Sequence, residues 1–256
     1  MELGAKMTED AYQGFAERYD LFFEEFGKHS SNQVEFFRRL FRENGVSKVL
    51  DCACGTGHDL VMFDSLGVEV LGSDISPSML ERARKNLTKL GLGIPVRCAD
   101  FRELRLHFSE EFDAVVCLSS SLLEAGDEEQ VLRALRSMHE VLRDNGILVV
   151  SQGTTDKQWE AKPKFISMVN RADFSRVLAI DYLDRGARYN ILDLFHGAGR
   201  DELIVWTKEY PLILLRDDYE LLLEAAGFST TDFYGSYTFE PYEKTASNIL
   251  LGTAHK

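Results

Sequence analysis

The stretch Val49-Leu50-Asp51-Cys52-Ala53-Cys54-Gly55-Thr56-Gly57-His58-Asp59 decides the fold expected of this chain. It predicts a buried strand that ends in a carboxylate, a turn of small residues and the start of a helix. A second apolar run ends at Asp74, 23 positions after Asp51. In an α/β sheet two such strand ends lie side by side at the edge where ligands bind. Gly55 and Gly57 remove side chains where a ligand must approach backbone N–H groups.

A carboxylate at the tip of the second strand can accept hydrogen bonds from both hydroxyls of a ribose, so we expect a cofactor that contains a nucleoside. The NAD fingerprint G-x-G-x-x-G fits poorly, because Leu60 replaces its third glycine. Asp51 would also repel a pyrophosphate, whereas it would attract an α-ammonium group. No G-K-[ST] follows, which excludes a P-loop. These features favour S-adenosylmethionine, which carries an ammonium and a sulfonium and no phosphate.

The same stretch resembles motif I of class I S-adenosylmethionine-dependent methyltransferases, and four later segments resemble the family's other motifs in the right order. These segments are 68–80 (ribose-binding strand and helix), 98–101 (adenine-binding turn), 112–118 (motif IV) and 142–150 (the helix-turn-strand that closes the sheet). With this resemblance we expect cofactor contacts from Asp51, Ala53, Gly55, Asp74, Ile75, Met79, Asp100, Phe101 and Leu118.

Several of these residues have a plain structural alternative. Asp74 could cap the next helix, Asp100 could shape its turn without touching adenine, and Phe101 could belong to the core. Tyr12 and Tyr19 are candidates for a lid over the methionine end of the cofactor, or for simple packing of an amphipathic helix on the sheet.

The composition limits the classes of function. The net charge of −13 argues against a nucleic-acid partner, which requires a basic footprint. No run of 18 apolar residues and no apolar signal core occur, so we expect a cytoplasmic protein without a membrane partner. The four cysteines are interpreted as reduced thiols. Cys52 and Cys54 lack a second pair with ligand spacing, so no metal is expected.

The order of elements predicts an α/β fold with a mostly parallel Rossmann-like sheet, helices on both faces and a small antiparallel β insertion. We divide the chain into an N-terminal helical lid (1–45), a cofactor-binding core (46–152), a β-rich insertion that covers the substrate (153–215) and a C-terminal part of the core sheet (216–256). The lid consists of an aromatic amphipathic helix within 8–29 and a helix that starts at Ser30. Insertion strands are expected near 175–183, 187–196 and 202–210, and a last core strand at 246–252. The resemblance implies that this last strand is antiparallel.

Methyl transfer from a sulfonium is an in-line displacement that needs positioning and exclusion of water, with little acid–base help. The substrate side most resembles glycine/sarcosine N-methyltransferases, through segments 50–57, 112–121, 210–211 and 239–242. The resemblance implies that Tyr242, and more weakly Tyr210, lie near the substrate. It also implies an insertion arginine on the substrate carboxylate, either Arg188 or Arg200, although each could be a solvated surface charge. The family's Arg-Asn-Tyr-Asp run is replaced here by Gly153-Thr154-Thr155-Asp156.

The expected activity is transfer of a methyl group from S-adenosylmethionine to the nitrogen of a small amine or amino acid, with S-adenosylhomocysteine as product. Because an ammonium has no lone pair, we expect a mostly neutral, aromatic pocket with one clamp for a carboxylate. Alternatives are an O-methyltransferase, an amino-sugar N-methyltransferase, a protein or RNA methyltransferase, or a cofactor-binding protein without catalysis. The aromatic N-terminal stretch is a candidate contact for a homo-oligomer.

Overall fold

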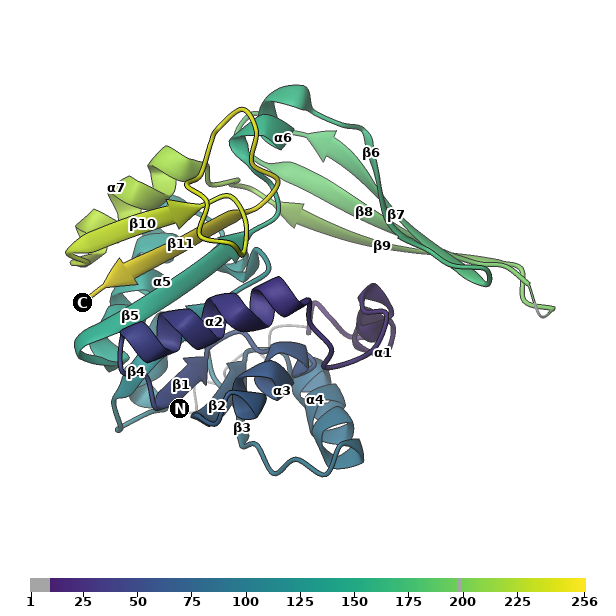
Figure 1. Ribbon diagram of the computed structural model, residues 1–256. Helices are drawn as coiled ribbons and strands as arrows, with labels where there is room; N and C mark the ends of the chain where they lie inside the picture. Colours follow the sequence, from purple (N-terminus) through teal and green to yellow (C-terminus); the bar gives the residue numbers. More distant parts are fainter. Residues whose placement is uncertain (1–9, 198) are drawn as a thin grey trace, which may run out of the picture.

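A seven-stranded sheet forms the centre of the protein, in the order β10-β11-β5-β4-β1-β2-β3. We describe it from a computed structural model that covers residues 10–197 and 199–256 (Figure 1). β11 runs antiparallel to both of its neighbours, and the remaining pairs are parallel, which confirms the predicted fold class. The strands are β1 (Lys48–Asp51), β2 (Glu69–Asp74), β3 (Val96–Cys98), β4 (Phe112–Cys117), β5 (Leu142–Gln152), β10 (Thr230–Tyr234) and β11 (Leu250–His255).

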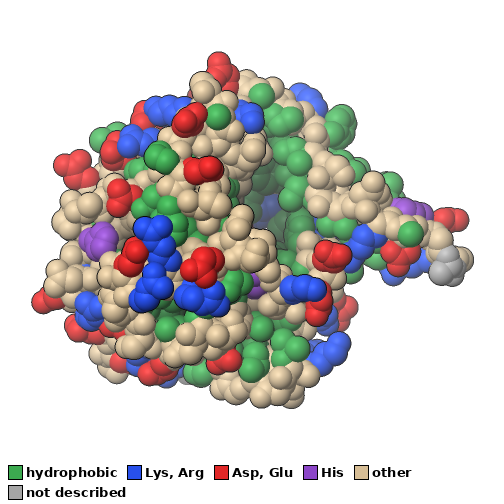
Figure 2. All heavy atoms as spheres, viewed as in Figure 1, with side chains coloured by type: hydrophobic (Ala, Val, Ile, Leu, Met, Phe, Trp, Pro, Cys, Tyr) green, Lys and Arg blue, Asp and Glu red, His purple; other side chains and the backbone are tan. Residues whose placement is uncertain are grey.

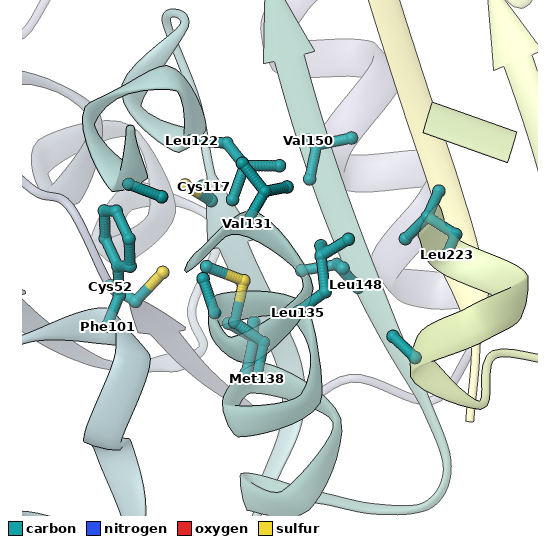
Figure 3. Close-up of a cluster of buried hydrophobic side chains, with 14 of the residues drawn as sticks. Cys52, Phe101, Cys117, Leu122, Val131, Leu135, Met138, Leu148, Val150 and Leu223 are labelled. Carbon is teal, nitrogen blue, oxygen red and sulfur yellow. The ribbon is translucent and has the colours of Figure 1, made fainter. Parts of the chain in front are cut away.

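Helices cover both faces of this sheet because its strands alternate apolar side chains between the two faces. Val49 and Val70 belong to a core cluster with the first set of helices, whereas Leu50 and Leu71 belong to a cluster with the second set. Figure 3 shows part of the second cluster, including Leu135, Leu148 and Leu223. The first set is α2 (Ser31–Glu43), α3 (His58–Ser65) and α4 (Pro77–Lys89), and the second is α5 (Glu128–Val141) and α7 (Arg216–Ala226).

A separate four-stranded antiparallel sheet projects from the core, with its strands extending past the body of the protein (Figure 1). The three predicted insertion strands are confirmed to within one residue. A further strand and a short helix were not predicted, because segment 165–170 lacks clear alternation and the helix is less than two turns long. The elements are α6 (Asp156–Ala161), β6 (Phe165–Asn170), β7 (Phe174–Tyr182), β8 (Ala187–Phe195) and β9 (Glu202–Tyr210).

The predicted aromatic helix within 8–29 is wrong. The described part of this stretch forms only α1 (Ala16–Tyr19) and the 3₁₀ turn η1 (Asp20–Phe22), and residues 8 and 9 lie outside the described residues. Gly14 and Gly27 have φ values of +79° and +81°, which interrupt a right-handed helix. Tyr12 and Phe15 pack instead on the second sheet, where the Phe15 ring stacks on Trp206 with centroids 4.3 Å apart. Phe23 packs on the core, against His58.

Two other boundaries illustrate local control of the fold. The helix predicted from Ser30 is confirmed as α2. It starts here because Ser30 Oγ accepts a hydrogen bond from the backbone N–H of Gln33 and so caps the helix. The last strand starts later than predicted, since Ser247 and Glu243 exchange hydrogen bonds in a turn before it. Within the described residues, no helix combines the length and the apolar character that a membrane crossing requires.

Candidate functional site

The carboxyl ends of β1, β2 and β4 meet at one edge of the central sheet, with Asp51 in register with Gly72 of β2 and Val116 of β4. The chain then turns through Gly55 and Gly57, whose φ values of +53° and +88° lie in the left-handed region that favours glycine. A Cβ at Gly55 would stand 3.3 Å from Met79 Cε. This turn therefore places bare backbone above the sheet edge.

Asp74 ends β2 and ties the two strand ends together. Its Oδ2 accepts from the N–H of Gly55 at 2.9 Å and its Oδ1 from the N–H of Ser76 at 2.8 Å. Burial raises the pKa of Asp74 to about 6. At pH 7 the group is thus mainly ionised, and each oxygen keeps acceptor capacity for a ligand hydroxyl.

Asp51 lies deeper, only 2% exposed, and the N–H of Ala53 donates to its Oδ1 at 3.2 Å. Burial raises the pKa of Asp51 well above its ordinary value, and the charges of Asp59 and Asp74 add to this effect.

Three adjoining cavities open at this edge. The smallest, the Asp74 pocket (about 110 Å³), is lined by Tyr12, Tyr19, Cys52, Ala53, Gly55, Asp74, Ile75, Met79, Asp100, Phe101, Arg102, Ser121 and Glu124. The histidine pocket (about 500 Å³) is lined by residues that include Tyr19, Phe23, His29, Gly55, His58, Asp59, Leu118 and Ser119. The tyrosine chamber (about 190 Å³) is lined by residues that include Tyr12, Tyr19, Ser121, Glu124, Met168, Tyr189, Ile191, Trp206 and Tyr210. Figure 2 shows a hollow with apolar walls between the core and the projecting sheet.

The histidine pocket contains a histidine that is neutral at pH 7. The N–H of Gly27 donates to His58 Nδ1 at 2.9 Å, and the ring stacks on Phe23 with centroids 3.5 Å apart. Burial lowers the pKa of His58 to about 4. His29 Nε2 lies 2.7 Å from Asp59 Oδ1. Donor atoms of these two histidines and Asp59 lie within 4.8 Å of one another, but His58 Nδ1 and His29 Nε2 already have protein partners.

The tyrosine chamber is organised around Glu124, on the 3₁₀ turn η3 (Ser121–Ala125) that follows β4. The hydroxyls of Tyr12 and Tyr210 donate to Glu124 Oε1 at 2.7 and 2.9 Å, and Lys208 Nζ lies 2.5 Å from Oε2. Burial raises the pKa of both tyrosines well above the ordinary value, so both hydroxyls remain protonated donors.

The N-terminal segment roofs these cavities through anchors at both ends. Asp10 accepts hydrogen bonds from Ser76 Oγ at 2.7 Å and from the N–H of Ser78 at 2.9 Å. Arg18 pairs with Asp193 of β8. Tyr19, beside Arg18, lines all three cavities.

Known proteins resemble this chain in sequence and in fold. Residues 49–146 match the family model of a methyltransferase domain. A glycine/sarcosine N-methyltransferase of Aphanothece halophytica is 29% identical over 245 residues, which cover 95% of this chain and 89% of that protein. A dTDP-3-amino-3,4,6-trideoxy-α-D-glucopyranose N,N-dimethyltransferase of Streptomyces venezuelae is 34% identical, over 53% of this chain and 55% of that protein. The crystal structure of an S-adenosylmethionine-dependent methyltransferase from Clostridium acetobutylicum superposes with a TM-score of 0.79 at 17% identity, over 95% of this chain and 98% of that one.

The chain is a class I S-adenosylmethionine-dependent methyltransferase. In this methyltransferase the expected cofactor residues gather at one place. Residues predicted from the motifs line the Asp74 pocket or, for Leu118, the histidine pocket, and Tyr12 and Tyr19 form the roof. Asp51 differs, because it lies beneath the loop and lines none of the three cavities. Asp100 also shapes its turn, since it caps η2 (Phe101–Leu106) and pairs with Arg102.

The residues expected on the substrate side are not brought together. Tyr210 lines the chamber. Tyr242 lines none of the three cavities, and its hydroxyl donates to Asp156 Oδ2 at 2.8 Å. Arg188 and Arg200 also lie outside these cavities, where they are exposed and pair with Glu209 at 2.8 Å and Glu202 at 2.7 Å.

Sequence reasoning missed other lining residues of the methyltransferase, notably Glu124, Trp206, His29 and His58. One signal was available in β9, where Trp206, Lys208 and Tyr210 alternate and therefore share a face of the strand. The histidines carried no such signal, since their contacts join segments far apart in sequence.

Proposed function

We propose that the enzyme transfers a methyl group from S-adenosylmethionine to the nitrogen of a small amine or amino acid. The observation that carries this proposal is the tyrosine chamber, an aromatic cavity that shares Tyr19 and Ser121 with both other cavities of the site and Glu124 with the Asp74 pocket. Two relatives whose names specify N-methyl transfer, to glycine or sarcosine and to an amino sugar, support the same reaction.

The adenosine would occupy the Asp74 pocket. Its ribose hydroxyls would donate to Asp74, and its adenine would lie against Met79. The methionine end would extend into the histidine pocket, past Leu118, and the acceptor would enter the tyrosine chamber. The cofactor supplies an activated methyl group, so the main task of the residues is to bind and orient the reactants and to exclude water. The segment 10–29 and the second sheet would cover the site during transfer.

The electrostatics of the chamber suit an amine acceptor. A strongly acidic pocket would hold the acceptor as an ammonium, which has no lone pair for attack. Here Lys208 and two phenol hydroxyls offset the charge of Glu124. The chamber therefore has an aromatic, nearly neutral lining, and we propose that transfer there requires no metal.

An amino sugar is the second candidate acceptor. It is favoured by one observation, that Arg188 and Arg200 pair with neighbouring glutamates outside the chamber, so that neither is placed to hold an amino-acid carboxylate.

The test is formation of S-adenosylhomocysteine with glycine, sarcosine, dimethylglycine, other amino acids, biogenic amines and amino sugars, with mass spectrometry to locate the new methyl group. We expect methylation at nitrogen of at least one of these acceptors. Methylation at oxygen alone would refute the proposal. So would cofactor binding without turnover of any acceptor, which would instead indicate a larger substrate or a non-catalytic role.

A further inference from the structure

Glu124 lies at the border between the two parts of the site. It lines both the Asp74 pocket and the tyrosine chamber, and it is the one charged side chain among the described residues that line the chamber. The cofactor motifs do not account for an acidic residue at position 124, which lies beyond motif IV (112–118).

The backbone that presents Glu124 is strained. Ser119 and Ser120 have φ values of 57° and 67°, in the left-handed region that non-glycine residues rarely adopt. The Ser119 N–H donates to Ser151 Oγ and the Ser120 N–H to the Ser151 carbonyl, each at 2.8 Å. Such strain persists only where surrounding contacts hold it, and it gathers at functional sites.

The partners of Glu124 leave room for a ligand. Its Oε1 accepts from two phenols and its Oε2 forms an ion pair with Lys208, whereas a carboxylate offers about four acceptor positions. One position on Oε2 therefore stays open. Because these donors share the charge of Glu124, a bound cation can leave again.

Resting on the proposed function, we propose that Glu124 is a catalytic residue that accepts a hydrogen bond from the acceptor amine and stabilises the positive charge that moves onto its nitrogen. In the transfer the nitrogen lone pair forms the N–C bond while the C–S bond breaks and its electrons return to sulfur. The sulfonium becomes a neutral thioether and the nitrogen becomes cationic. A fixed carboxylate beside that nitrogen binds the transition state more tightly than the neutral amine. Aromatic faces such as those of Tyr19 and Trp206 add cation–π attraction.

A binding test can examine this role without turnover. Choline and 3,3-dimethylbutan-1-ol are isosteres that differ in the charge on one atom, and each would be titrated into the enzyme saturated with S-adenosylhomocysteine. We expect the wild type to bind choline about tenfold more tightly than the neutral alcohol. Glu124→Gln should reduce this preference below about threefold, and Glu124→Asp should retain part of it. The control is Glu128→Gln, an exposed neighbour that pairs with Arg185, which should keep the full preference.

The kinetic test uses whichever acceptor the panel identifies. Glu124→Gln should lower kcat by about 100-fold while the affinity for S-adenosylhomocysteine changes less than twofold. An equal charge preference in the wild type and Glu124→Gln would overturn the proposal, as would failure of both isosteres to bind the wild type. If the panel identifies no acceptor, the proposed N-methyltransferase function fails, while the charge preference still decides whether Glu124 binds an ammonium.

Discussion

At the scale of single residues, the role that we propose for Asp74 in cofactor binding depends on its protonation state. Its carboxylate already accepts two backbone N–H groups, and burial raises its pKa to about 6. Below pH 6 the Asp74 carboxylate of the enzyme without cofactor becomes protonated and loses acceptor capacity for the ribose hydroxyls. Cofactor affinity should therefore fall as the pH drops from 7 to 5, by up to about tenfold per pH unit below 6.

Asp74→Asn separates this effect from other titrating groups. The variant should bind S-adenosylhomocysteine about 10–100-fold more weakly at pH 7, because it loses charge-assisted hydrogen bonds. The ratio of wild-type to variant affinity should shrink toward pH 5. Isothermal titration calorimetry at both pH values measures it, with the exposed Asp64→Asn as control. A ratio that stays constant from pH 7 to 5 would show that Asp74 does not titrate in this range.

At the scale of elements, a buried ion pair connects the N-terminal segment to the second sheet. Asp193 accepts from Arg176 Nε at 2.6 Å and Nη2 at 2.9 Å, both residues are fully buried, and Arg18 joins them. Arg176 also donates to the Arg18 carbonyl. Asp193→Ala would leave the buried Arg176 without a counter-charge and should destabilise the protein by about 3–5 kcal/mol.

Because Tyr19 adjoins this pair, the same variant should weaken cofactor binding as well as lower Tm. Glu202→Gln is the matched control, since it removes only an exposed partner of Arg200 and should change stability by less than about 1 kcal/mol. Thermal unfolding and calorimetry measure the two effects. A lower Tm with unchanged cofactor affinity would show that the position of Tyr19 over the cavities does not depend on this ion pair.

The same scale shows what sequence alone could predict. The core strands and the carboxylate at Asp74 follow from periodicity and small-residue turns, which act locally. The aromatic stretch before Ser30 follows tertiary contacts instead, since Phe15 stacks on Trp206 almost 200 residues away. The contacts of Glu124 with Tyr12 and Lys208 likewise join residues that are far apart in sequence and that only folding brings together. Local patterns thus located the sheet edge where we propose that the cofactor binds, whereas the tyrosine chamber depends on long-range packing.

At the scale of the whole molecule, the net charge of −13 bears on how the acceptor arrives. A small amine is mainly a cation at pH 7, and the field of an acidic protein raises its local concentration. The Debye length falls from about 30 Å at 0.01 M salt to about 8 Å at 0.15 M. The KM for an amine acceptor should therefore rise a few-fold over this range while kcat stays constant. The affinity for S-adenosylhomocysteine, which has no net charge, is the internal control and should stay unchanged. If the KM for the amine is equally insensitive to salt, the negative charge does not attract the acceptor, and its role is confined to solubility.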